Sequence, residues 1–158
     1  MQAVRNHVIM YLLAFIPFIH SCAMATEKVL LWPAIEGQIL NSGKPVSDLE
    51  LIQTLYWNYE ENKAPPRVLT VKTDENGRFV FPKITGEIST GFLTRLFYQP
   101  GIVMEIGAEF QGKSYSVDIS GSSSHLKLPE STRVLKCDLQ NSRLFEGTLL
   151  VECERIQP

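Results

Sequence analysis

The sequence contains few of the residues on which catalysis and metal binding usually depend, with only three cysteines and three histidines in 158 residues. Its 15 basic and 17 acidic residues give a formal net charge of -2, so no basic excess exists to neutralise the phosphates of a nucleic acid. The same balance argues against a polybasic membrane-surface module. With 44% hydrophobic and 20% charged residues, the chain has the composition of one globular domain.

No apolar run is long enough to span a bilayer as a permanent helix. The run Val8 to Ile19 is 12 residues long, whereas a transmembrane helix needs roughly 20. It follows a short segment with one charge, Arg5, and precedes a short polar stretch, which is the layout of a secretory signal peptide. We therefore expect residues 1–25 to be a signal peptide, residues 26–158 to form a single domain, and the protein to be exported to the periplasm.

Two processing sites compete at the end of this segment. Ala23-Met24-Ala25 suits a general signal peptidase, which would release a soluble protein beginning at Thr26. The stretch 19–22 resembles a degenerate lipobox, which would leave Cys22 lipidated and the protein attached to a membrane. His20 is an unusual residue in such a box, so the soluble product is favoured.

Either route leaves Cys137 and Cys153 as the two thiols of the mature protein. An even pair of cysteines in an oxidising compartment predicts a disulfide. Alternating apolar residues place both on the core side of two strands, and a hairpin centred near Phe145 would set them opposite each other. Two unpaired buried thiols are the alternative if the protein stays in the cytoplasm.

Alternation of apolar and polar residues predicts a series of strands in the mature chain. Residues 35–40 precede a Gly- and Pro-containing turn at 41–45, and residues 49–59 alternate with a period of two. Helical spacing from Ile88 to Phe97 predicts one short helix that stops at Pro100.

Two further segments have the pattern of β-hairpins. Residues 68–73 and 78–81 flank a turn with Asn76-Gly77. Residues 102–110 and 115–119 flank Gln111-Gly112. The mature chain is therefore predicted to be mostly β-structure.

Two motifs stand out between residues 35 and 82. The first comprises Gly43, Pro45 and Val46, and the second comprises Thr73, Asp74, Gly77, Phe79 and Phe81. Together they resemble the turns of carboxypeptidase-regulatory-like, transthyretin-like (prealbumin-like) β-sandwich domains. The resemblance implies an all-β fold, an antiparallel Greek-key β-sandwich of seven to eight strands, here with one short helix. It implies no activity, because such domains usually serve as accessory or binding modules.

The layout of an export signal, one sandwich and a two-cysteine tail is similar to that of small exported bacterial proteins of this type. Some of these are immunity proteins that neutralise antibacterial effectors delivered by type VI secretion. The resemblance thus implies a protein partner, with contact to a membrane only if Cys22 is lipidated.

The residues themselves offer little chemistry. His125 is the only histidine after residue 25, and it lies in a Gly/Ser-rich stretch that is poorly suited to hold a catalytic base. One histidine and two core-facing cysteines do not supply the three or four ligands of a zinc site. We expect no catalytic residue, no metal and no cofactor, although an exposed His125 could enter a partner's metal site.

Aromatic residues next to an acidic loop are the remaining candidates for binding a partner. Trp57 and Tyr59 have the parity of core residues, whereas Tyr56 points the other way. The leading hypothesis is a non-enzymatic periplasmic immunity protein that uses these residues or His125. The alternative is an envelope-associated accessory or carbohydrate-binding module, and a hydrolase that uses His125 is the least favoured class.

Overall fold

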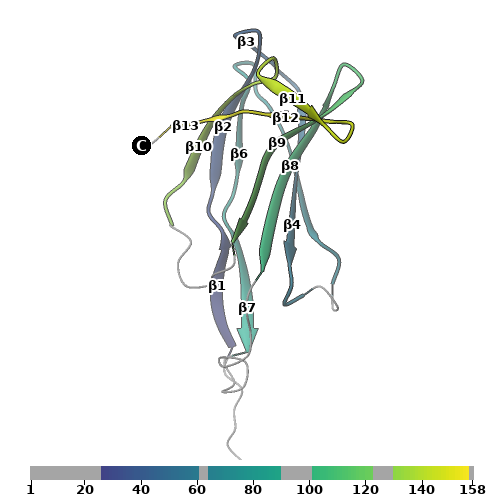
Figure 1. Cartoon of the computed structure of the whole chain (residues 1–158). Helices are drawn as coiled ribbons and strands as arrows, with labels where there is room; N and C mark the ends of the chain where they lie inside the picture. The colour runs from purple at the N-terminus through teal and green to yellow at the C-terminus, as the bar shows by residue number, and fades with distance from the viewer. Residues whose placement is uncertain (1–25, 61–63, 90–100, 123–129, 157–158) are drawn as a thin grey trace, which may run out of the picture.

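The computed structural model describes residues 26–60, 64–89, 101–122 and 130–156, and it folds them into strands connected by turns (Figure 1). The strands of these ranges are β1 (Thr26–Trp32), β2 (Ile35–Asn41), β3 (Lys44–Pro45), β4 (Glu50–Trp57), β5 (Arg67–Lys72), β6 (Arg78–Phe81), β7 (Ile84–Ser89), β8 (Ile102–Phe110), β9 (Lys113–Ser122), β10 (Arg133–Asp138), β11 (Ser142–Phe145), β12 (Thr148–Val151) and β13 (Glu154–Ile156). Within the same ranges, no helix is long and apolar enough to cross a membrane. The predicted signal peptide, Cys22 and His125 lie outside the described residues.

Two sheets face each other across a common apolar core. One sheet has six strands in the order β11-β12-β9-β8-β4-β5, and the other has the order β13-β10-β2-β3, with β6 also paired to β2. Buried side chains of both sheets, such as Leu51 and Met104 from the first and Ile39 and Phe81 from the second, belong to one core cluster. The predicted all-β, sandwich-like fold is therefore confirmed.

A two-stranded ribbon, β1 with β7, extends the second sheet (Figure 1). The pairs Trp32 with Ile84 and Ile35 with Phe81 follow the same register, so the ribbon continues the β2–β6 ladder. An irregularity in the ladder at Leu31 lets Leu31 and its neighbour Trp32 both enter the core. This ribbon was not predicted.

Several local predictions are confirmed. The turn after β2 has Ser42 and Gly43 at positive φ angles of 53° and 74°, and β8 and β9 form a hairpin through Gln111-Gly112, with φ angles of 52° and 72°. Strand β4 buries alternate residues, as its period of two indicates. These features depend on contacts between residues close in sequence.

Other predictions were wrong where distant segments decide the pairing. The predicted hairpin of residues 68–73 and 78–81 has its turn, with Gly77 at positive φ. Its two strands do not pair with each other, because β5 pairs with β4 in the six-stranded sheet and β6 pairs with β2 in the five-stranded sheet. The strand pairs are mostly antiparallel, as predicted, but β10 runs parallel to β2 and β12 runs parallel to β9. The described residues also form thirteen strands rather than seven or eight, because the ribbon, β3 and the extra C-terminal strands were not foreseen.

The predicted helix from Ile88 to Phe97 is not seen. Ile88 belongs instead to β7, where it pairs with Glu27 of β1. Residues 90–97, which would make up the rest of that helix, lie outside the described residues. The pairing with β1 decides the conformation of Ile88, and β1 is distant in sequence.

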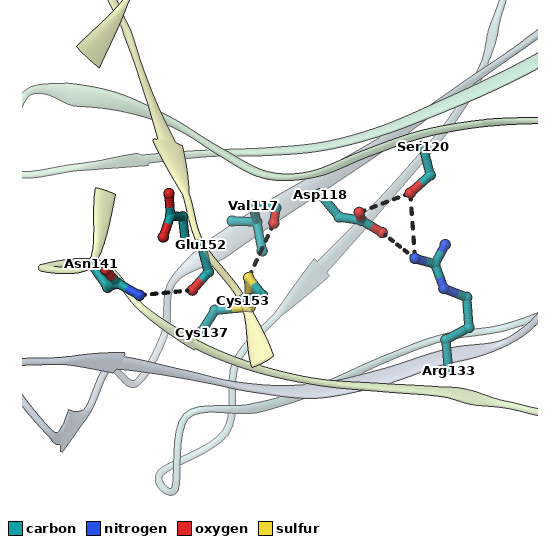
Figure 2. Close-up of a disulfide and its surroundings, with 8 residues drawn as sticks. All are labelled: Val117, Asp118, Ser120, Arg133, Cys137, Asn141, Glu152 and Cys153. Carbon is teal, nitrogen blue, oxygen red and sulfur yellow. Dashed lines mark hydrogen bonds and ion pairs between the residues drawn. A yellow bond between two sulfur atoms is a disulfide. The ribbon is translucent and has the colours of Figure 1, made fainter. Parts of the chain in front are cut away.

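The predicted disulfide between Cys137 and Cys153 is present (Figure 2). The chain leaves the five-stranded sheet after β10, forms the β11–β12 hairpin at the edge of the six-stranded sheet, and returns as β13 beside β10. The disulfide therefore links Cys137, near the end of β10, to Cys153, immediately before β13. The single hairpin predicted around Phe145 is in fact two ladders, β10–β13 and β11–β12.

Candidate functional site

The outward surface of the six-stranded sheet carries an unusual number of apolar side chains. Its exposed members, which we call the outer apolar face, are Ile52, Tyr56, Val68, Val103 and Ile119, each between 41% and 57% exposed. They come from β4, β5, β8 and β9, which are adjacent strands. Isolated apolar residues on a surface are ordinary, but a group on one face needs an explanation.

Strand register brings these residues together. Tyr56 lies opposite Val103 in the β4–β8 ladder, and directly paired residues of antiparallel strands share a face. One step along, Thr54 pairs with both Val68 and Glu105, and Glu105 pairs with Ile119. Thr54 and the half-buried Glu105 therefore lie in the middle of the face. Tyr56 and Val103 lie on one side of this pair, and Ile52 lies on the other.

A pocket of about 470 Å³ opens at one end of this face. Tyr56 and Val103 line it on the sheet side, and Pro65 and Pro66 line it on the side of the connection that leads to β5. Its size is within the roughly 300–1,000 Å³ typical of small-ligand sites. The pocket and the outer apolar face thus share Tyr56 and Val103.

An ion pair fixes the connection that borders the pocket. Arg67 donates to both carboxylate oxygens of Glu60, at 2.6 Å from Nη2 and 3.1 Å from Nε. Its third nitrogen, Nη1, donates to the backbone oxygen of Thr85 in β7 at 2.6 Å. Because all three nitrogens of the half-buried guanidinium are used, Arg67 ties β5, the loop and the ribbon together.

Trp57 belongs to the core, as its parity predicts, and is only 5% exposed. Its ring stacks on Tyr59, with 5.0 Å between ring centroids, and the Arg67 guanidinium lies 5.8 Å from its centroid. On another side, a Cβ added to Gly86 would lie 2.5 Å from a Trp57 ring carbon, so only glycine allows β7 to approach this closely. Trp57 therefore lines the pocket as a core residue and exposes little surface to a partner.

The sequence-predicted residues are thus only partly brought together. Tyr56 is half exposed on the outer apolar face, whereas Trp57 and the partly buried Tyr59 pack into the core. His125 cannot be placed because it lies outside the described residues. In the described part of the chain, no group of three or more His, Cys, Asp or Glu side chains is arranged to hold a metal ion.

Four residues of the outer apolar face were missed in the sequence: Ile52, Val68, Val103 and Ile119. Ile52, Val68 and Val103 are apolar residues at positions with the parity of polar neighbours in their own strands. Ile119 instead has the parity of the buried Tyr115 and Val117, and it faces outward because the β8–β9 register shifts between Ile106 and Gly107. For Ile52, Val68 and Val103, that exception to alternation was the available signal, whereas nothing in the alternation of β9 marks Ile119. The signal becomes informative only when the exceptions in adjacent strands fall on one face.

The structure therefore defines an all-β protein with two facing sheets, one of which presents an apolar outer surface. A family model described as "Domain of unknown function (DUF6795)" matches residues 35–142, which is more than half of the chain. The chain belongs to this family. The family is not described as transthyretin-like, so that relationship stays a prediction.

The comparisons with other proteins add little about activity. No curated protein matches the chain. Among solved structures, it is similar to the crystal structure of 3-chlorocatechol 1,2-dioxygenase from Rhodococcus opacus 1CP, with 14% sequence identity and a TM-score of 0.35. The match covers 78% of this chain and 60% of the dioxygenase chain. A likeness at this level carries no inference about the chemistry of the present protein.

Proposed function

We propose that this protein is a non-enzymatic, exported module that binds another protein through its outer apolar face. The observation that carries the proposal is the group of five exposed apolar side chains on four adjacent strands. A group of exposed apolar side chains on one face is typical of interaction sites, because its burial against a partner is favourable. Tyr56 is of a residue type that is enriched at the centre of such interfaces.

The specific form of the proposal is an immunity protein that neutralises an antibacterial effector delivered by type VI secretion. It is supported by the sequence resemblance and by the predicted signal peptide, which would place the protein in the periplasm. The transthyretin-like relationship and a Greek-key connection belong to the same proposal. Their support is the motif turns, in which Gly43 and Gly77 adopt positive φ angles.

Two valines provide a matched test of the face. Val68 lies on the outer apolar face, whereas Val80 points outward from β6 of the other sheet, and each is 57% exposed. Val68→Asp would place a charge in the proposed interface, and Val80→Asp would add the same charge elsewhere. Because both positions are exposed, both variants should keep the stability of the wild type to within about 1 kcal/mol.

The experiment is co-expression with an effector that is encoded beside this gene and directed to the periplasm. We expect the wild type and Val80→Asp to restore growth, and Val68→Asp to lose most of the protection. Equal rescue by both variants would show that the interface does not include the outer apolar face. If no neighbouring gene product is toxic, or none is neutralised, the immunity function is wrong.

A carbohydrate-binding or envelope-associated accessory module is the second candidate, and the pocket beside Tyr56 favours it. An exposed aromatic ring next to polar groups such as those of Asn58 and Glu60 can stack on a sugar. Binding of soluble cell-wall glycan fragments, measured by calorimetry, should then be lost in Tyr56→Ala. Glycan binding that is unchanged in this variant would exclude the pocket as its site.

A further inference from the structure

A second hollow, of about 420 Å³, lies at the open margin between the two sheets. The residues that matter here are Trp32 at the end of β1, Ser120 of β9, Arg133 of β10 and Arg155 of β13, all of which line it. Ser120 belongs to the six-stranded sheet, Arg133 and Arg155 belong to the five-stranded sheet, and Trp32 belongs to the β1–β7 ribbon. This hollow shares no lining residue with the pocket beside Tyr56.

The side chain of Arg133, on β10 of the five-stranded sheet, contacts β9 of the six-stranded sheet. Its Nη2 lies 3.2 Å from Oδ2 of Asp118 and 3.3 Å from Oγ of Ser120, both on β9 (Figure 2). Its guanidinium also lies 5.6 Å from the centroid of the Trp32 ring. The side chain is therefore held in place, yet within the described residues its Nε and Nη1 donate no hydrogen bond.

Arg155 adds a second positive charge to the same hollow. Arg155 is paired in register with the buried Leu135 of β10, so the two side chains lie on the same side of the sheet. Arg133 is two residues before Leu135 on β10, so its side chain points to that side as well. Unlike Arg133, Arg155 forms no ion pair with a described residue. Burial lowers the pKa of Arg133, Asp118 raises it and Arg155 lowers it, which indicates that the two guanidinium groups are close enough to repel.

One lining residue of the hollow, Trp32, carries a buried donor without an acceptor among the described residues. The indole Nε1 of Trp32 is buried, and in the described parts of the chain it has no hydrogen-bond partner. A buried donor without an acceptor destabilises the fold, so such a group is often explained by a ligand or an ion. Two arginines are thus opposed by one carboxylate, Asp118, beside an unpaired N–H group.

We propose that this hollow binds the phosphate group of a small phosphorylated molecule. Guanidinium groups bind phosphate through paired charge-assisted hydrogen bonds, and Arg133 and Arg155 offer two such groups from adjacent strands. The indole N–H of the lining Trp32 is a neutral donor, whereas the Ser120 hydroxyl already donates to Oδ1 of Asp118 at 2.9 Å. The volume is in the roughly 300–1,000 Å³ range of sites for small organic ligands, so it accepts a phosphate monoester and not the free ion alone.

The two tryptophans make the test internally controlled. In a ¹H–¹⁵N correlation spectrum of the full mature protein, the indole signal of Trp32 reports on the hollow, and that of Trp57 reports on the core beneath the other pocket. Inorganic phosphate and glycerol 3-phosphate are titrated separately, with ionic strength held constant by sodium chloride. We expect both ligands to shift the Trp32 signal saturably, the monoester at a lower concentration, while the Trp57 signal stays unchanged.

Variants then separate binding from general charge effects. Arg155→Gln removes an exposed arginine that forms no ion pair within the described ranges, so the variant should fold normally. It should weaken binding of both phosphates by about tenfold or more, the effect of losing a charged hydrogen bond. Arg78→Gln is the matched control, because it removes the same charge from β6, on the other side of β2 from β10. It should leave the affinity unchanged.

Three results would overturn the proposal. The first is a Trp32 shift that does not saturate, and the second is equal weakening in Arg155→Gln and Arg78→Gln. The third comes from a parallel titration with sodium acetate: an affinity for acetate equal to that for phosphate would assign the hollow to carboxylates. If glycerol 3-phosphate binds no more tightly than inorganic phosphate, the preference for a monoester is wrong.

Discussion

Asp138 at the end of β10 accepts a hydrogen bond from the backbone N–H of Gly43, 95 residues earlier, with an Oδ2–N distance of 2.8 Å. Its Oδ1 accepts from the N–H groups of Ser42 and Gln140, each at 3.0 Å. These bonds hold the pKa of Asp138 below its ordinary value; the Gln140 N–H is the largest cause, Gly43 and Ser42 add to it, and burial opposes them. The carboxylate therefore joins the β2–β3 turn to β10.

Asp138→Asn should lower the free energy of unfolding by about 1–2 kcal/mol at pH 7, because charged hydrogen bonds are lost. A carboxylate with a lowered pKa in the folded state stabilises the fold above its unfolded pKa, and the contribution disappears as the pH falls through the folded pKa. The difference between wild type and variant should therefore shrink below about pH 4. Urea unfolding at pH 7 and pH 3 measures it.

Asp48→Asn is the control for this pH dependence. Asp48 forms an exposed ion pair with Lys72, with an Nζ–Oδ1 distance of 3.0 Å. Solvent and salt screen such an exposed pair, so this variant should change stability little at either pH. A difference between wild type and Asp138→Asn that is equally large at pH 3 and pH 7 would contradict the assigned role.

Gly86→Ala should destabilise the fold by about 1–3 kcal/mol, because the new Cβ would overlap the Trp57 ring and force it or β7 to move. Gly107→Ala is the matched control, since its nearest neighbour, the Tyr115 backbone oxygen, would be at an ordinary 3.8 Å. Denaturant unfolding followed by tryptophan emission measures both. Equal stability of the two variants would show that Trp57 has room to shift.

The double variant Cys137→Ala/Cys153→Ala should lower the free energy of unfolding by about 3 kcal/mol, because the disulfide closes a loop with a sequence separation of 16. Reduction should destabilise the wild type and leave the double variant unaffected. The intact mass of protein purified without reductant should rise by two hydrogens on reduction. Two free thiols in that protein before reduction would contradict the prediction.

Gln53→Met should raise the free energy of unfolding by about 1 kcal/mol or more. Gln53 is 0% exposed at a core position of β4, and neither its amide nitrogen nor its amide oxygen has a hydrogen-bond partner among the described residues. Replacing an unpaired buried amide by an apolar side chain of similar length removes this penalty. A loss of stability, measured by urea unfolding, would show that the amide has a partner such as a buried water.

The sequence predicts those features that neighbouring residues determine. The positive φ angles at Ser42-Gly43 and Gln111-Gly112 follow from turn composition, and the orientation of Tyr56 follows from the parity of its strand. The outer apolar face could not be predicted in the same way. It exists because Tyr56 is paired with Val103, and Glu105 is paired with Ile119, across separate strands.

The disulfide shows which parts of the fold can be predicted from neighbouring residues and which cannot. The register that sets Cys137 opposite Cys153 extends the β10–β13 ladder, in which Lys136 pairs with Glu154. The residues between the cysteines form their own hairpin instead, with Glu146 and Gly147 at positive φ, because β12 pairs with β9 of the other sheet. That contact pairs Leu149 with Tyr115, 34 residues earlier, which alternation within one strand cannot reveal.

Strand β2 has consequences for the order in which the chain can fold. It has β6 on one side and β10 on the other, and Ile35 of β2 pairs with Arg133 of β10, far along the chain. During synthesis, one edge of β2 therefore stays unpaired until nearly the entire chain is available. Such long-range pairing predicts slow refolding, in milliseconds to seconds, and an interval in which an open apolar strand edge is accessible to chaperones or to other chains.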